Sequence, residues 1–260
     1  MKETVKKLIH ERFNNNGYVI ITEKQKLYCR PFNPNDIDLI KEIYSDLKCR
    51  ILLVGDENRS EQQLTEWIDN VISRYKDCGL SFYVVCKKEE KLGIVGLGEF
   101  NIDPETKLSY TSIHYAFPVR SHKKGYCSEI CEELVRFVVK DLNIDCIHAQ
   151  TLSYNKVSQL ILRRLGFEPN GKQNCPDNYK DEYVTKFLLT HESYKQALMK
   201  EKISVNSKLH DNSRDFRKLI KKDYKKWYRN REDVKSNAIF YKRIINYLNL
   251  TSPSGSIKNL

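Results

Sequence analysis

A basic turn between a strand-like run and a strongly amphipathic segment constrains this chain more than any other feature of its sequence. The turn at 120–125 reads Arg-Ser-His-Lys-Lys-Gly and follows a β-type run at 108–117. In the next segment, 125–141, apolar residues recur at helical spacing along one face. A strand that turns directly into a helix points unpaired backbone N–H groups and the positive end of the helix dipole at one place, which favours phosphate. The sequence therefore predicts an anion-binding turn.

The residue types in this turn suit the same ligand. Gly125 lets the backbone approach a ligand closely. Up to four positive groups surround that glycine, a number that suits a pyrophosphate or a 3′-phosphate; they are Arg120, His122, Lys123 and Lys124. A solvated basic loop is the other interpretation, and this segment alone does not decide between the two.

The remaining pattern predicts an α+β fold. Three β-type runs in succession predict antiparallel neighbours, and the strand-helix-strand alternation after Leu108 predicts parallel neighbours joined by crossover helices. The expected sheet is mixed, mostly antiparallel and twisted, with helices on its faces. We expect helices at 4–13, 37–47, 61–75, 125–141 and 156–164, strands at 18–21, 26–32, 80–87, 92–101, 108–117, 144–152 and 182–189, and a hairpin turn at 88–91.

Two motifs resemble those of the GNAT superfamily of N-acetyltransferases. The turn at 120–125 is similar to the family's [Q/R]-x-x-G-x-[G/A] turn, which binds the coenzyme A pyrophosphate, and Gly125-Tyr126-Cys127-Ser128-Glu129 is similar to its G-Y-x-[ST]-E continuation. Lys123 stands where the first glycine is expected, which implies either a looser turn or a lysine side chain that takes over part of the phosphate contact. The second motif, 155–167, is similar to the family's N-x-x-S stretch that ends in Gly-Phe.

Together the motifs cover the coenzyme half of a domain at 26–189 and appear in the family's order. The resemblance implies a GNAT fold with acetyl-CoA as cosubstrate and no metal. The implied coenzyme-binding residues are Arg120, His122, Lys123, Lys124, Gly125, Tyr126, Cys127, Asn155 and Ser158. The N-x-x-S form and the long helix before the hairpin look most like the branch that acetylates N-terminal amines of ribosomal proteins. That branch also includes enzymes acting on polyamines and antibiotics.

The resemblance also implies direct attack of an amine on the thioester, without an acyl-enzyme. Many relatives use a tyrosine seven residues after the asparagine as the acid for the departing thiolate, but Leu162 stands there, so Ser158 becomes the candidate acid. A hydroxyl that only satisfies the backbone at the helix start is its other interpretation. Relatives often carry a glutamate base at the place of Ser112; here His114 and Glu99 compete for that role, and His114 has the suitable ordinary pKa.

Positive charge is concentrated at the C-terminal end of the chain. The formal net charge is +11, and 191–260 contributes 17 Lys/Arg against 7 Asp/Glu. The expected organisation is an N-terminal helix and short strand at 1–25, the acetyltransferase domain at 26–189 and a basic helical extension at 190–260. Clustered lysine and arginine with aromatic residues favour phosphate backbones, so 214–243 is a candidate contact to RNA, the ribosome or an acidic partner. A helical extension that packs on the domain or a second subunit is the alternative.

Two function classes therefore remain open from the sequence. The first is an active N-acetyltransferase acting on an amine acceptor of unknown identity. The second is a catalytically weak GNAT-fold module that binds RNA, the ribosome or a partner through its basic helices. The sequence contains no run of about 20 apolar residues that would predict a membrane span. We expect a cytoplasmic protein. A secreted effector acting on host amines is also compatible with the lysine-rich composition. The eight cysteines show no CxxC pair, so we expect reduced thiols.

Overall fold

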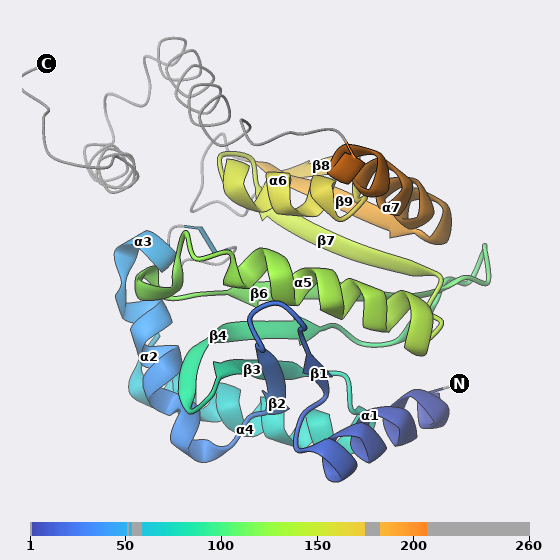
Figure 1. Cartoon of the computed structure of the whole chain (residues 1–260). Helices are drawn as coiled ribbons and strands as arrows, with labels where there is room; N and C mark the ends of the chain where they lie inside the picture. Colours follow the sequence, from blue (N-terminus) through green and yellow to red (C-terminus); the bar gives the residue numbers. More distant parts are fainter. Residues whose placement is uncertain (1, 51, 54–58, 175–182, 207–260) are drawn as a thin grey trace, which may run out of the picture. The chain divides into compact units, whose positions relative to one another are not determined.

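A mixed sheet of nine strands organises the described part of the chain (Figure 1). The structure is a computed structural model that describes residues 2–50, 52–53, 59–174 and 183–206. The chain divides into two units, 1–200 and 201–260, and the whole sheet belongs to the first. The basic segment 214–243, with its predicted helices, lies outside the described residues. No helix in the described ranges is both long and apolar enough to cross a membrane.

The elements follow the predicted order closely. The helices are α1 (Lys2–Asn16), α2 (Ile37–Ser45), α3 (Leu47–Arg50), α4 (Glu61–Cys78), α5 (Tyr126–Arg136), α6 (Lys156–Arg164) and α7 (His191–Asn206), with short turns η1 (Pro34–Asp36) and η2 (Val119–Ser121) and a π-helical turn η3 (Phe137–Asp141). The strands are β1 (Ile20–Ile21), β2 (Tyr28–Pro31), β3 (Phe82–Lys87), β4 (Glu90–Leu97), β5 (Asn101–Ile102), β6 (Ser109–Ala116), β7 (Cys146–Leu152), β8 (Glu168–Asn174) and β9 (Tyr183–Thr190).

The strand order is β1-β2-β3-β4-β6-β7-β9-β8, with β5 paired to β6. The antiparallel succession of β3, β4 and β6 and the parallel pairing of β6 with β7 are confirmed. The expectation that the closing strand also lies parallel to its neighbour is wrong, because β9 pairs antiparallel with β7. An unpredicted strand, β8, pairs with the far side of β9. All seven residues of β8 are exposed, so no apolar alternation marks it in the sequence.

Two local predictions also need correction. The turn between β3 and β4 is shorter than expected: strand pairing runs to Lys87 and Glu90, and Lys88 turns the chain with φ +53°. The helix expected at 125–141 ends as a π-helical turn, in which the N–H of Leu142 bonds to the carbonyl of Phe137 at 3.0 Å.

Each face of the sheet packs against its own set of helices. On one face, buried residues of α5 such as Leu134 join Val85 and Val95 in a single core. On the other face, α2 and α4 pack against Val84 and Ile94. Neighbouring residues of one strand therefore belong to different cores, because successive side chains of a strand point to opposite faces. Figure 1 shows α5 in front of the sheet and α4 behind it.

The parallel pairing of β6 and β7 covers only part of each strand. Its register runs from Tyr110 opposite Cys146 to Ser112 opposite His148. Beyond that point, 113–116 pairs with β4 and 149–152 pairs with β9. The two central strands therefore separate toward their carboxyl ends.

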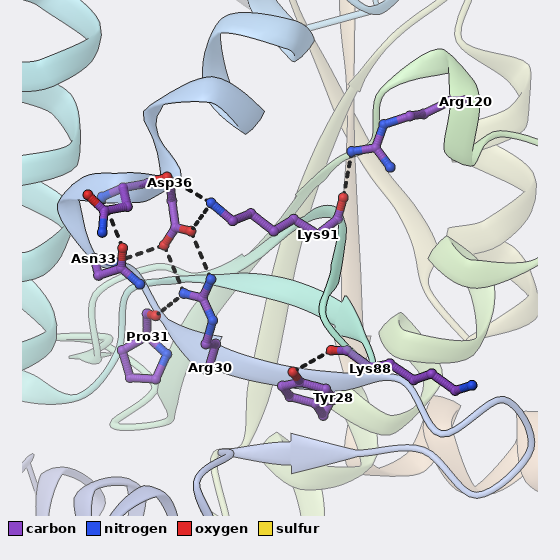
Figure 2. Close-up of polar contacts among 9 residues, drawn as sticks. Tyr28, Arg30, Pro31, Asn33, Asp36, Lys88, Lys91 and Arg120 are labelled. Atoms are coloured by element: carbon purple, nitrogen blue, oxygen red, sulfur yellow. Dashed lines mark hydrogen bonds and ion pairs between the residues drawn. The ribbon is translucent and has the colours of Figure 1, made fainter.

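A buried carboxylate ties the start of α2 to the sheet (Figure 2). Asp36 is fully buried and accepts two hydrogen bonds from the Arg30 guanidinium, both at 2.8 Å, and one from the backbone N–H of Asn33 at 2.9 Å. The Lys91 ammonium lies 2.9 Å from its Oδ1. Burial alone would raise the pKa of Asp36, but the hydrogen bonds from Arg30, Asn33 and Lys91 outweigh it and lower that pKa.

Replacing Asp36 by alanine is expected to lower the free energy of unfolding by about 3–5 kcal/mol, because Arg30 and Lys91 would lose their buried partner. Urea unfolding at pH 7 measures this loss. Because the folded-state pKa of Asp36 is lowered, its contribution is present above the ordinary value of 3.8 and is lost as pH falls through the folded-state pKa. Lys41→Ala, which breaks an exposed pair with Glu61, is the control and should cost less than about 1 kcal/mol. Equal losses in the two variants would contradict the assignment.

Candidate active site

The separation of β6 and β7 brings two helix starts to the same edge of the sheet. Because β6 and β7 are parallel, their carboxyl ends lie at one edge, and α5 and α6 follow them. Both helices contribute buried residues to the same core, so they lie on the same face. Ligands of open α/β sheets bind in the crevice outside the carboxyl ends of the strands.

The predicted anion-binding turn has the backbone that a phosphate site needs. Gly125 is the N-cap of α5 with φ +80°, and no side chain caps the first turn of that helix. Lys123 adopts φ +62°, so the lysine that replaces the expected glycine keeps a glycine-like backbone. Ser121 adds a buried Oγ that has no hydrogen-bond partner among the described residues. An oxyanion at this turn would satisfy the backbone N–H groups at the start of α5, so the turn fits a pyrophosphate.

Two of the predicted basic side chains hold the turn in place. The Arg120 guanidinium bonds to Glu42 at 2.8 Å and to Glu90 at 2.9 Å. It also donates to the carbonyl of Lys91 at 2.6 Å (Figure 2). The Nε2 of His122 lies 2.7 Å from the carbonyl oxygen of Phe117. These contacts fasten the turn to α2, to the β3–β4 hairpin and to the end of β6.

The other residues of the first coenzyme motif surround the start of α5. The Lys124 ammonium lies 5.9 Å from the centre of the Tyr126 ring. Cys127 is a half-buried free thiol whose side chain is hydrogen-bonded to the free thiol of Cys131, one turn further along the helix. Lys124 also accepts a hydrogen bond at its carbonyl from Gln25. Arg120, His122, Lys123, Lys124, Gly125, Tyr126 and Cys127 thus form one continuous turn and helix start.

The second motif places its serine against a tyrosine that the sequence pattern did not reveal. Asn155 caps α6, since its Oδ1 accepts the N–H of Ser158 at 3.1 Å. The buried Ser158 Oγ lies 2.7 Å from the hydroxyl of Tyr115 on β6. Burial, together with the nearby thiols of Cys127 and Cys131, holds the pKa of Tyr115 well above its ordinary value. The tyrosine therefore stays protonated at neutral pH and spans the opening between β6 and α6.

His114 lies on the opposite face of β6 from Tyr115. It stands opposite Gly96 of β4, and its Nε2 lies 2.9 Å from the Ser112 hydroxyl. The Phe82 ring packs at 5.5 Å from the imidazole, centre to centre, while the residue as a whole remains exposed. The protein atoms around the ring lower the pKa of His114, and the positive charge of Arg74 lowers it further. The imidazole is therefore neutral at pH 7, as a proton acceptor must be.

Glu99, the competing base, lies just past the end of β4. The residue is exposed, and within the described ranges its carboxylate makes no hydrogen bond or ion pair. Its backbone carbonyl accepts a hydrogen bond from Asn101 at 3.4 Å. The structure therefore brings His114 and Ser112 together, and it does not bring Glu99 into hydrogen-bonding contact with either.

His114 is expected to titrate below its ordinary value of 6.5. Replacing Arg74 by glutamine removes the nearby positive charge, so the pKa of His114 should rise in that variant. NMR titration of histidine ring resonances measures both values, and the His114→Gln spectrum assigns the signal. An Arg74→Gln midpoint at or below that of the unaltered protein would show that the guanidinium does not act on this ring.

The comparison with known families identifies the domain. The family model described as "Acetyltransferase (GNAT) domain" matches residues 26–168. Among curated proteins, none matches the sequence.

Solved structures share the fold at low identity. An acetyltransferase of the GNAT family from Bacillus anthracis has a TM-score of 0.54 and 17% identity, covering 66% of this chain and 98% of that one. A spermidine N-acetyltransferase from Vibrio cholerae, in complex with CoA and spermine, gives 0.56 and 17% over 66% and 99%. A ribosomal L7/L12 α-N-protein acetyltransferase in complex with coenzyme A gives 0.55 and 16% over 67% and 98%.

Proposed function

The chain belongs to the GNAT acetyltransferase family, and on that basis we propose that it transfers an acetyl group from acetyl-CoA to a primary amine. The transfer is a direct attack in a ternary complex. The observation that carries this proposal is that His114 and Tyr115 lie on opposite faces of β6, beside the point where β6 and β7 separate, and that Tyr115 contacts Ser158 of α6.

The uncapped start of α5 would hold the coenzyme phosphates. The backbone N–H groups after Gly125, the Ser121 hydroxyl and the Lys123 and Lys124 side chains are the proposed contacts. Arg120 and His122 act on this site by positioning the turn, since their side chains already bond to protein groups. Coenzyme A or acetyl-CoA appears in the structures of several fold relatives, which supports the same assignment.

The carboxyl-terminal half of β6 carries His114 on one face and Tyr115, the partner of Ser158, on the other. Beyond Ser112 its backbone pairs with β4 on one side, and the side that faced β7 is released from the parallel ladder. Its N–H groups there are the proposed donors to the oxyanion that develops at the thioester carbonyl.

His114 and Ser158 divide the proton transfers. His114, neutral at pH 7, takes the proton that the attacking amine loses. Ser158 gives its hydroxyl proton to the sulfur that leaves, and the Tyr115 hydroxyl donates in turn to Ser158 Oγ. The net movement is one proton from nitrogen to sulfur, and solvent restores both groups. The amine adds to the thioester carbonyl, and the tetrahedral intermediate then expels the thiolate, so the base and the acid act on two different substituents of the same carbon.

The acceptor class is proposed at the level of a primary amine. Fold relatives include enzymes named for spermidine and for the N-terminus of ribosomal L7/L12, so a protein N-terminus, a lysine and a small-molecule amine all belong to this proposal. Membership of the branch acting on ribosomal protein N-termini remains a prediction, as does a contact of 214–243 with RNA, the ribosome or an acidic partner.

Acetyl-CoA is expected to bind with a micromolar dissociation constant, and Lys123→Glu and Gly125→Asp are each expected to weaken it at least 100-fold. The first places a negative charge beside the phosphates, and the second adds a charged side chain at φ +80°. Isothermal titration calorimetry measures both effects. Lys107→Glu is the matched control, because Lys107 is another lysine with positive φ, in the β5–β6 hairpin. Absence of binding to the unaltered protein would overturn the enzyme assignment.

Replacing Ser158 by alanine is expected to lower kcat about 100-fold with little change in the KM for acetyl-CoA, because general acid catalysis contributes at least this factor. Tyr115→Phe removes one neutral hydrogen bond and should lower kcat about 10-fold. If the two act as one unit, the double variant should be no slower than Ser158→Ala. Multiplicative losses would mean that Tyr115 and Ser158 act independently.

A further inference from the structure

Arg74 differs from the arginines that hold this fold together. Arg30, Arg120 and Arg136 each bond to a carboxylate, as does Arg12 to Asp141. The Arg74 guanidinium donates to the carbonyl of Leu97 at 3.1 Å, and its Nε is buried without a partner. Within the described ranges it forms no ion pair. A cation partly withdrawn from water without a counter-charge is costly, so its position needs an explanation.

The position of Arg74 connects it to the proposed base. Arg74 lies near the C-terminal end of α4, and its hydrogen bond to Leu97 places it at the end of β4. On β4 the neighbouring Gly96 stands opposite His114, and the guanidinium charge acts on that imidazole. The other groups that contact the ring, Phe82 and the Ser112 hydroxyl, are neutral. The exposed side of His114 therefore faces solvent beside an uncompensated positive charge.

We infer that Arg74 binds a carboxylate of the acceptor, so that the substrates of this site are amines carrying an acidic group, such as the N-terminus of an acidic peptide. This inference rests on the proposed function, because it takes His114 as the group that faces the acceptor amine. A guanidinium matches a carboxylate in charge and in the spacing of its donors. A polyamine would bring further positive charge to the same place, which disfavours that acceptor class.

Binding of such an acceptor would also change the pKa of His114, the proposed base. The charge of Arg74 lowers the pKa of His114 in the free protein. A bound carboxylate cancels much of that charge, so the pKa of His114 rises when the acceptor is in place. A higher pKa makes the imidazole a stronger base at the moment when the amine must lose its proton.

A binding experiment tests the subsite without turnover. The probes are N-acetyl-alanyl-aspartyl amide and its neutral twin, N-acetyl-alanyl-asparaginyl amide, each titrated into the full chain while the ring resonances of His114 are followed by NMR. The acidic probe should shift these resonances and raise the titration midpoint, whereas the neutral probe should do neither. Arg74→Gln should abolish the response and Arg74→Lys should retain part of it. Equal responses to both probes, or a response that survives in Arg74→Gln, would overturn the inference.

A turnover experiment separates this inference from the proposed function. Alanyl-aspartyl amide and alanyl-asparaginyl amide have nearly the same reacting amine, and their acetylation by acetyl-CoA is compared with that of spermidine. The unaltered protein should favour the aspartyl substrate at least tenfold in kcat/KM, and Arg74→Gln should lose that preference. Acetylation without such a preference contradicts the carboxylate subsite alone. If no amine is acetylated, the proposed function fails, and the NMR response still decides whether Arg74 binds a carboxylate. Thermal unfolding of each variant establishes that it is folded.

Discussion

The limited parallel pairing of β6 with β7 is the constraint on which the rest of the site depends. A fully paired central ladder would satisfy every backbone group of β6 and leave no room for a ligand between the strands. Here the pairing ends at Ser112 and His148, and each strand continues with its outer neighbour only. The separation exposes the β6 backbone where an oxyanion could bind, and it places the starts of α5 and α6 beside the same opening. A strand pairing therefore determines where chemistry can occur.

The pleat of a single strand also separates the two halves of the proposed reaction. His114 and Tyr115 are adjacent in sequence, and their side chains point to opposite faces because the side-chain period of a strand is two. One faces α4 and the other faces the helices that follow β6 and β7. The two environments differ in charge as well: burial raises the pKa of the tyrosine, whereas the protein atoms around the imidazole and the charge of Arg74 lower the pKa of the histidine. Both groups thus stay uncharged at neutral pH, one as a donor and one as an acceptor.

Charged residues of the same type serve different purposes according to their partners. Arg30 bonds to Asp36 (Figure 2), and Arg120 bonds to Glu42 and Glu90, so these arginines join β2, α2, the β3–β4 hairpin and the turn before α5. Arg74 has no such partner in the part of the chain that the structure describes, and it lies beside the proposed base. The sequence alone could not distinguish these roles, because the partners are up to 78 residues away.

The sequence by itself determined the boundaries of α6 and the place of the basic turn before α5, because these depend on local spacing. The GNAT family was indicated by the resemblance of two motifs and is shown by the family model. The sequence pattern missed β8, whose residues carry no apolar alternation, and it placed β9 beside a parallel neighbour. Only the tertiary structure decided that Tyr115 meets Ser158, that Arg120 holds the turn through Glu42 and Glu90, and that Arg74 lies beside His114. Each of these joins residues far apart in the chain, and a contact of that kind depends on strand order and register, which local patterns do not encode.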